Sequence, residues 1–321
     1  MSADAPPLAA GRAGLGGRAP LLWGAAVAAG LAALPLILAG YELSIATEIL
    51  IFALLAMSID VLAGYAGRTS LSHGAIFGAA TYVVIYWTAV HGGSPWVGLL
   101  VGVAAATVLA ALFALLATRV SGVYFLLLTL ALGMVVWGVC LRWTSVTGGE
   151  NGIRGAGRPA PLEDPVAFFY FVLAVAAALF VLIWRFVHSP FGLTLRGIRD
   201  SDSRMRSLGY DVPLHLFLAF TVSGFFAGIA GALYALFNNF VSPSTVQLSQ
   251  SVEGLLMAIV GGIGTLAGSL IGAAAIITLE NVVSAYTARW PLVLGLMFIL
   301  TMIFAPDGIL GAVRKLLARR R

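Results

Sequence analysis

The chain is 321 residues long, and 60% of its residues are hydrophobic while only 10% are charged. Soluble domains carry about 25% charged residues, so this composition excludes a water-soluble enzyme. A mean hydropathy of +1.01 also excludes a disordered chain. The net charge of +5 does not indicate binding to nucleic acid, because the basic residues lie between apolar runs. The single cysteine, Cys140, excludes an intrachain disulfide.

The apolar residues form ten runs, two of them short, and a helix of about twenty residues crosses roughly 30 Å of hydrocarbon. We therefore expect an all-α polytopic membrane protein with about ten transmembrane helices between residues 20 and 305. A cytosolic tail over 1–19, without a signal-peptide cleavage site, precedes them, and a basic cytosolic tail over 306–321 follows. The runs are 20–39, 43–63, 75–90, 95–117, 122–141, 166–187, 214–237, 253–264, 266–283 and 291–305.

Positive charge predicts the orientation of these helices, since loops rich in Lys and Arg stay in the cytoplasm. With the N-terminus inside, the cytoplasmic stretches carry fourteen of the eighteen Lys and Arg residues. Ten crossings also place the Arg-rich C-terminus inside. This N-in and C-in topology gives an external loop over 142–165 and a cytoplasmic loop over 188–213.

Two glycine-rich stretches break the apolar pattern. One is Gly64–Gly74, and the other, Glu253–Gly268, carries four glycines near its end. Irregular backbone at membrane depth is tolerated only where protein shields it or where it faces a wet cavity, and transporters often bind solute beside broken helices. The stretches therefore indicate either a solute pathway or ordinary packing of small residues. For 253–283, a re-entrant pair and two full crossings both fit.

The chain lacks the motifs of the enzyme classes that its composition leaves open. Its only lysine, Lys315, has no P-loop glycine frame, and Gly11–Gly16 does not match the dinucleotide-binding pattern. No two of the four histidines are spaced to chelate a metal from one helix face. We predict no enzyme activity, no metal site and no cofactor in this chain.

Three acidic residues, Glu48, Asp60 and Glu280, fall within apolar runs, where an unpaired charge is costly. A proton-driven carrier would need such a group near the midplane, but all three lie off centre. Solvation at helix ends, or pairing with Arg68 or Arg289, explains them better.

Two polar loops stand out. The external one contains Thr144–Gly155, which would either touch a zwitterionic solute or simply turn the chain. In the cytoplasmic one, apolar residues at 195, 198, 205 and 208 have helical spacing. This spacing predicts a short amphipathic helix that docks a partner, although a basic loop held at anionic headgroups fits as well.

Five sequence blocks occur in a fixed order. They are G-Y-A-G-x-x-S-L-x-H at Gly64–His73, T-G-G-x-N-G-I at Thr147–Ile153, S-x-F-G-x-x-L-R-x-I-R-D at Ser189–Asp200, F-V-S-P at Phe240–Pro243 and G-G-I-G-T-L-x-G at Gly261–Gly268. Together they resemble the permease subunits of branched-chain amino acid ABC importers, of the LivM type. Arg68 and Ser269 depart from the family pattern, in which glutamine and proline are usual.

The resemblance implies an inward path for leucine, isoleucine and valine across a bacterial inner membrane, formed with a second, LivH-like permease. Two cytosolic ATPases would bind the ATP, and an external solute-binding protein would deliver the solute. By position, the resemblance implies an ATPase-coupling loop that includes Arg196, Arg199, Asp200, Leu208 and Gly209. It implies a translocation path or gate at Tyr65, Ser70, Ser72, His73, Gly261, Gly262, Gly264 and Thr265, and a contact with the binding protein at Thr147, Gly148, Gly149, Glu150 and Asn151.

Three alternatives remain at this point. Permeases with similar blocks move urea, short amides or other amino acids, so the solute is open. A stand-alone carrier driven by protons or sodium would depend on Glu48. A membrane enzyme that acts on lipids would need a catalytic cluster at one interface, and the sequence supplies none.

Overall fold

The protein is seen in a computed structural model that describes residues 30–38, 40–287, 289–305 and 308–312. The predicted tail over 1–19 lies outside these residues, as does most of the tail over 306–321. The described secondary structure is helical apart from one pair of two-residue strands, β1 and β2, which are antiparallel. The prediction of an all-α protein is therefore confirmed.

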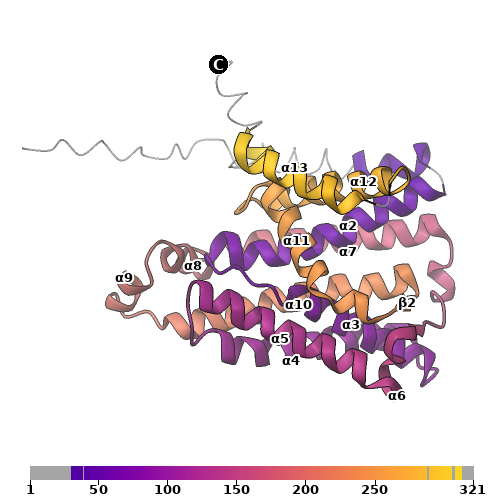
Figure 1. The fold of residues 1–321 in the computed structure, drawn as a ribbon, viewed down its shortest axis with the longest axis horizontal. Coiled ribbons are helices and arrows are strands. Elements are labelled where there is room, and N and C mark those ends of the chain that lie inside the picture. Colours follow the sequence, from indigo (N-terminus) through magenta and orange to yellow (C-terminus); the bar gives the residue numbers. More distant parts are fainter. Residues whose placement is uncertain (1–29, 39, 288, 306–307, 313–321) are drawn as a thin grey trace, which may run out of the picture.

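The helices run roughly along one axis, with α8 and α9 at one end of the bundle and α6 and β2 at the other (Figure 1). A π-helical stretch, Val61–Tyr65, extends α2. Short 3₁₀ turns occur at Gly149–Asn151, Ala160–Leu162 and Pro243–Val246. The main elements are α2 (Tyr41–Asp60), α3 (His73–Ala89), α4 (Pro95–Ala117), α5 (Val123–Arg142), α6 (Thr144–Thr147), β1 (Ile153–Arg154), α7 (Pro165–Val187), α8 (Pro190–Asp200), α9 (Asp202–Ser207), α10 (Val212–Asn238), β2 (Phe240–Val241), α11 (Leu248–Gly261), α12 (Leu266–Ser284) and α13 (Trp290–Phe304).

Six of the described helical segments are long and apolar enough to cross a membrane: α2 with its π-helical extension, α4, α5, α7, α10 and α12. Shorter apolar helices accompany them, so the chain is a polytopic membrane protein. Nine of the ten predicted runs coincide with described helices, and the first, 20–39, lies mostly outside the described residues, with helix at 30–37. The number of crossings and the N-in, C-in orientation stay predictions.

The centre of the bundle is formed by α2 and α10. Within the most apolar part of α2 and its extension, 83% of residues are buried, against 22–33% for α4, α5 and α7. α2 and α10 are antiparallel, since Ser58 lies beside Ser223 and Phe52 packs against Tyr234. The outer helices expose apolar side chains to their surroundings, as expected in lipid.

Two helices, α3 and α11, begin inside the bundle after stretches without α-helix over 66–72 and 239–247. His73, the first residue of α3, lies beside Ser223, which is eleven residues from the start of α10 and fifteen from its end. At 1.5 Å per residue these separations are roughly 16 and 22 Å, so α3 starts near mid-depth. α11 meets it there, because Gly74 N donates to Ser251 Oγ at 2.8 Å. The break predicted at Gly64–Gly74 is thus present.

The loop over 188–213 differs from its prediction. Two helices, α8 and α9, replace the single amphipathic helix, because Ser201 is extended and its Oγ accepts a hydrogen bond from Arg204 N. A serine that caps the next helix in this way ends the preceding one. Leu195, Ile198 and Met205 are buried, whereas Leu208 is 67% exposed. α9 ends at Ser207, so Leu208 lies beyond the helix and the four apolar residues do not share one face.

Candidate translocation and coupling site

Three segments that are far apart in the sequence meet at the end of the bundle that carries α8. They are the π-helical end of α2, α8 itself, and the turn Gly262–Thr265 between α11 and α12. We call this region the junction. Arg199 Nη1, on α8, donates to Gly64 O at 2.6 Å, and Gly264 N donates to Asp60 Oδ1 at 2.6 Å. Arg199, a predicted coupling residue, therefore contacts the residue that precedes Tyr65, a predicted gate residue. Gly264, a second predicted gate residue, is joined to the same helix end through Asp60.

The junction needs glycine on both sides of the Asp60 carboxylate. A Cβ on Gly64 would lie 2.4 Å from Asp60 Oδ1 and 2.5 Å from Gly264 N, which is closer than any real contact. Gly264 has a φ of +79°, a conformation that side chains with a Cβ rarely adopt. Carbonyl groups at a helix end lack partners within the helix, so the guanidinium of Arg199 stabilises the end of α2.

Two further arginines link the loop over 188–213 to the end of α2 and the residues that follow it. The guanidinium carbon of Arg196 lies 5.1 Å from the centre of the buried Tyr65 ring, a cation–π distance. Arg68, which is almost completely buried, forms an ion pair with Asp202 at the start of α9. The expectation that Arg68 pairs with an acid of the apolar runs is therefore wrong.

The other predicted coupling residues lie on the surface. Asp200 is exposed, with one carboxylate oxygen 3.6 Å from Arg199 Nε. Leu208 and Gly209 are exposed, and a Cβ on Gly209 would meet open space, although its φ of +87° disfavours one. These residues leave a surface that a partner can reach.

The predicted path residues form two groups at different depths. Tyr65 and the turn Gly261–Thr265 belong to the junction, where Thr265 Oγ1 donates to Gly262 O at 2.5 Å. Ser70, Ser72 and His73 lie deeper and are fully buried. Ser70 Oγ and Ser72 Oγ are 3.1 Å apart, and His73 Nε2 is 2.7 Å from Ser223 Oγ. The rest of the chain therefore shields these three side chains completely.

At the opposite end, the predicted binding-protein contact is only partly accessible. Thr147 is buried and donates inward to Cys140 O at 2.6 Å. Gly148 and Gly149 have positive φ values and turn the chain, while Glu150 and Asn151 are exposed. The strand pairing of Ile153 with Val241 fixes this loop to the end of α10.

Arg158 adds a second attachment of the external loop to α10. Its Nε donates to Leu236 O at 3.0 Å and its Nη2 donates to Phe237 O at 3.2 Å. The guanidinium also lies 4.2 Å from the centre of the Phe168 ring. The sequence gave no signal for these bonds beyond a basic residue in a polar loop.

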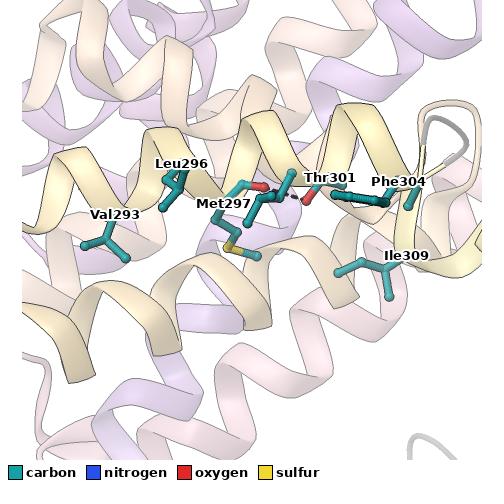
Figure 2. Close-up of a pocket in the computed structure, with 8 residues that line it drawn as sticks. Val293, Leu296, Met297, Thr301, Phe304 and Ile309 are labelled. Carbon is teal, nitrogen blue, oxygen red and sulfur yellow. Dashed lines mark hydrogen bonds between the residues drawn. The ribbon is translucent and has the colours of Figure 1, made fainter.

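An open apolar groove of about 380 Å³ runs along α13 (Figure 2). None of its eight lining residues is charged, and its one hydroxyl, on Thr301, donates to Met297 O at 2.8 Å. The groove offers no partner to a zwitterionic solute, so we do not assign it to the path. It is lined by Val293, Leu296, Met297, Leu300, Thr301, Phe304, Ala305 and Ile309.

Sequence reasoning missed the contacts of Asp60 and Arg68. Asp60 was noted as an acid near a helix end, but its bond to Gly264 joins residues 204 positions apart, which no local pattern reveals. The signal for Arg68 was its departure from the usual glutamine of the family pattern. A cation at that position gains an acidic partner, Asp202, in the cytoplasmic loop.

Comparison with known proteins agrees with this geometry. Residues 41–305 match the family described as the permease component of branched-chain amino acid transport systems. The chain belongs to this family. Membership makes it a permease subunit of an ABC transporter and not an enzyme, and ATP binds to partner ATPase subunits. The ion-coupled carrier and the lipid enzyme are thereby set aside.

The individual relatives are also permease proteins of transport systems. The chain is 27% identical over 308 residues to the high-affinity branched-chain amino acid transport system permease protein LivM of Escherichia coli, covering 87% of this chain and 72% of that protein. It is 23% identical over 283 residues to the LivH permease of the same system, covering 81% and 91%. An autoinducer 2 import system permease protein, LsrC of an Enterobacter species, is 31% identical over 147 residues, or 42% and 41%. No solved structure matches the chain.

Proposed function

We propose that this chain is one of two permease subunits that together form the inward path of an ABC importer for leucine, isoleucine and valine. Family membership and the similarity to LivM and LivH support the solute class. The observation that carries the mechanism is the bond from Arg199 Nη1 to Gly64 O, because it joins the predicted coupling loop to the broken end of a central helix.

The junction offers a direct route for motion. Two cytosolic ATPases would bind the exposed face of α8, α9 and the turn after them, where Leu208 and Tyr210 are 67% and 45% exposed. A displacement of α8 then pulls Gly64 through Arg199, and the carboxylate of Asp60 carries the displacement to the Gly264 turn. The ends of α2, α11 and α12 move together, which opens or closes the path on that side.

This assignment places the junction in the cytoplasm of a bacterial cell, with ten crossings and both termini inside. Exposed Glu150 and Asn151 at the opposite end are available to an external solute-binding protein. Tyr65, Ser70, Ser72, His73 and the Gly261–Thr265 turn line the path between the two ends.

The first test is to purify the tagged chain from detergent-solubilised membranes and identify the co-purifying proteins by mass spectrometry. We expect P-loop ATPases and a second permease. A chain that purifies alone and moves solute in proteoliposomes without ATP would contradict the proposal.

The coupling role is tested in the reconstituted complex. Arg199→Glu and Gly209→Trp should insert normally and retain ATP hydrolysis but lose uptake, because the first breaks the bond to Gly64 and the second strains the positive-φ turn after α9. Unchanged uptake in both variants would remove the loop from the mechanism. Measuring which of leucine, urea, acetamide and other amino acids is taken up decides among the solutes of related permeases.

A further inference from the structure

Two buried polar atoms lie at the meeting point of α3 and α11 without a hydrogen-bond partner among the described residues. They are Nδ1 of His73 and Oε1 of Gln250. The His73 side chain is fully buried. Nearly all buried polar atoms in proteins have partners, so each exception requires a physical explanation.

The hydrogen-bond chain around His73 defines the tautomer of the ring. Ser223 Oγ donates its proton to Ser58 O at 2.5 Å, so the hydroxyl can only accept from His73 Nε2, at 2.7 Å. An imidazolium that is fully buried without an anionic partner is strongly disfavoured. The ring is therefore neutral, and its Nδ1 carries a lone pair. Nδ1 of His73 and Oε1 of Gln250 are both hydrogen-bond acceptors.

The two acceptors belong to residues that adjoin one close contact. A Cβ on Gly74 would lie 2.6 Å from Ser251 N and 2.8 Å from Gln250 Cβ, so the first turns of α3 and α11 touch. Among the described residues, one direct hydrogen bond crosses this contact, and it runs from Gly74 N to Ser251 Oγ. Nδ1 is the ring nitrogen nearer the backbone, so the acceptor of His73 lies on the α3 side of the contact. We call this contact the α3–α11 crossing.

The crossing also brings together two helix N-termini at mid-depth. The N-terminal end of a helix carries partial positive charge and N–H groups that the helix itself does not use. Helices of 17 and 14 residues, such as α3 and α11, supply this field within the bundle. The buried acceptors suit a cation and the helix N-termini suit an anion, so the two together suit a group in which a cation and an anion lie close to each other.

We propose that the α3–α11 crossing is the constriction of the path and recognises the α-amino and α-carboxylate groups of its solute. The inference rests on the proposed function. When α3 and α11 separate, the ammonium group is held by His73 Nδ1 and Gln250 Oε1, and the carboxylate faces the two helix N-termini. Urea and short amides lack the carboxylate, so the crossing favours amino acids over the other solutes of related permeases.

Matched variants test this role in the complete reconstituted transporter with its binding protein. His73→Gln keeps a donor that reaches Ser223 but removes the acceptor at the Nδ1 position, and Gln250→Leu removes the second acceptor. Each should lower leucine turnover at saturating loaded binding protein by at least about tenfold. The half-saturating concentration of binding protein and the ATP hydrolysis rate should stay unchanged. Thr81→Ala is the control, because it removes an equally buried hydroxyl of α3 that bonds Phe77 O and Gly231 O, and it leaves both acceptors and the Ser223 bond in place.

If Thr81→Ala lowers turnover as much as His73→Gln does, loss of any buried polar group of α3 explains the effect and the proposal is wrong. If wild-type protein moves leucine and both acceptor variants move it at the wild-type rate, the crossing is not the recognition site, although the proposed function stands. If the wild-type complex moves no branched-chain amino acid, the proposed function itself fails.

A second measurement does not depend on the solute. In a Cys140→Ser background, Gln250→Cys should react with a small cationic thiol reagent during ATP turnover and not at rest, because turnover opens the crossing. Ser58→Cys, at a fully buried position on α2, should stay unreactive. Equal reaction of both cysteines, or none at Gln250→Cys, would overturn the assignment of the path.

Discussion

Replacing Gly64 with alanine is the sharpest test of the junction. The new Cβ would lie 2.4 Å from Asp60 Oδ1, whereas ordinary contacts begin near 3.4 Å, so the groups must separate by about 1 Å. If the Gly264 turn retreats by that distance, its 2.6 Å bond to Asp60 lengthens to about 3.6 Å and is lost.

The energetic consequence follows from the burial of Asp60. Loss of a backbone donor to a buried carboxylate costs about 1.5–3 kcal/mol. The state in which Gly264 N bonds Asp60 then becomes roughly 10- to 150-fold less populated. We expect ATP-dependent leucine uptake in proteoliposomes to fall at least about tenfold, with ATP hydrolysis largely kept.

The matched control is Gly138→Ala, inside α5, where an added Cβ meets nothing within 4 Å. It should behave as wild type. If Gly64→Ala keeps the wild-type ratio of leucine transported to ATP hydrolysed, then the contact between Asp60 and Gly264 does not transmit motion and the reasoning is refuted.

Three further predictions concern other contacts. Reversing the charge of Arg68 or of Asp202 alone should lower the free energy of unfolding by about 1 kcal/mol, and exchanging the two charges should restore it. A double-mutant cycle of unfolding in detergent measures this coupling, and a coupling of zero would show that the pair is unimportant. Arg158→Ala should lower the unfolding temperature, because two carbonyls at the end of α10 lose donors worth about 1 kcal/mol each, while Arg158→Lys should recover part of the loss. Leu208→Glu should leave the unfolding temperature unchanged, since the side chain is 67% exposed, but should abolish recovery of the ATPases in the pull-down. Normal recovery would place the partner surface elsewhere.

Much of the fold followed from local pattern. The apolar runs coincide with described helices because helix length and membrane thickness leave few alternatives once about twenty apolar residues occur together. The helical spacing of residues 195, 198, 205 and 208 correctly predicted helix in this loop, and Leu195, Ile198 and Met205 are buried. The spacing did not reveal that the hydroxyl of Ser201 divides the helix in two, or that Leu208 is exposed beyond the end of α9.

The site residues were predicted as separate groups, and only the tertiary structure showed which of them meet. Composition and spacing by themselves determined the membrane class, the helices, the glycine breaks and the absence of enzyme motifs. The ordered blocks added the family. The bond from Arg199 to Gly64 spans 135 positions and the contact of Gly74 with Ser251 spans 177. Such contacts depend on how α2, α3, α10 and α11 pack, and packing between helices is set by the whole bundle, which no single segment of sequence encodes.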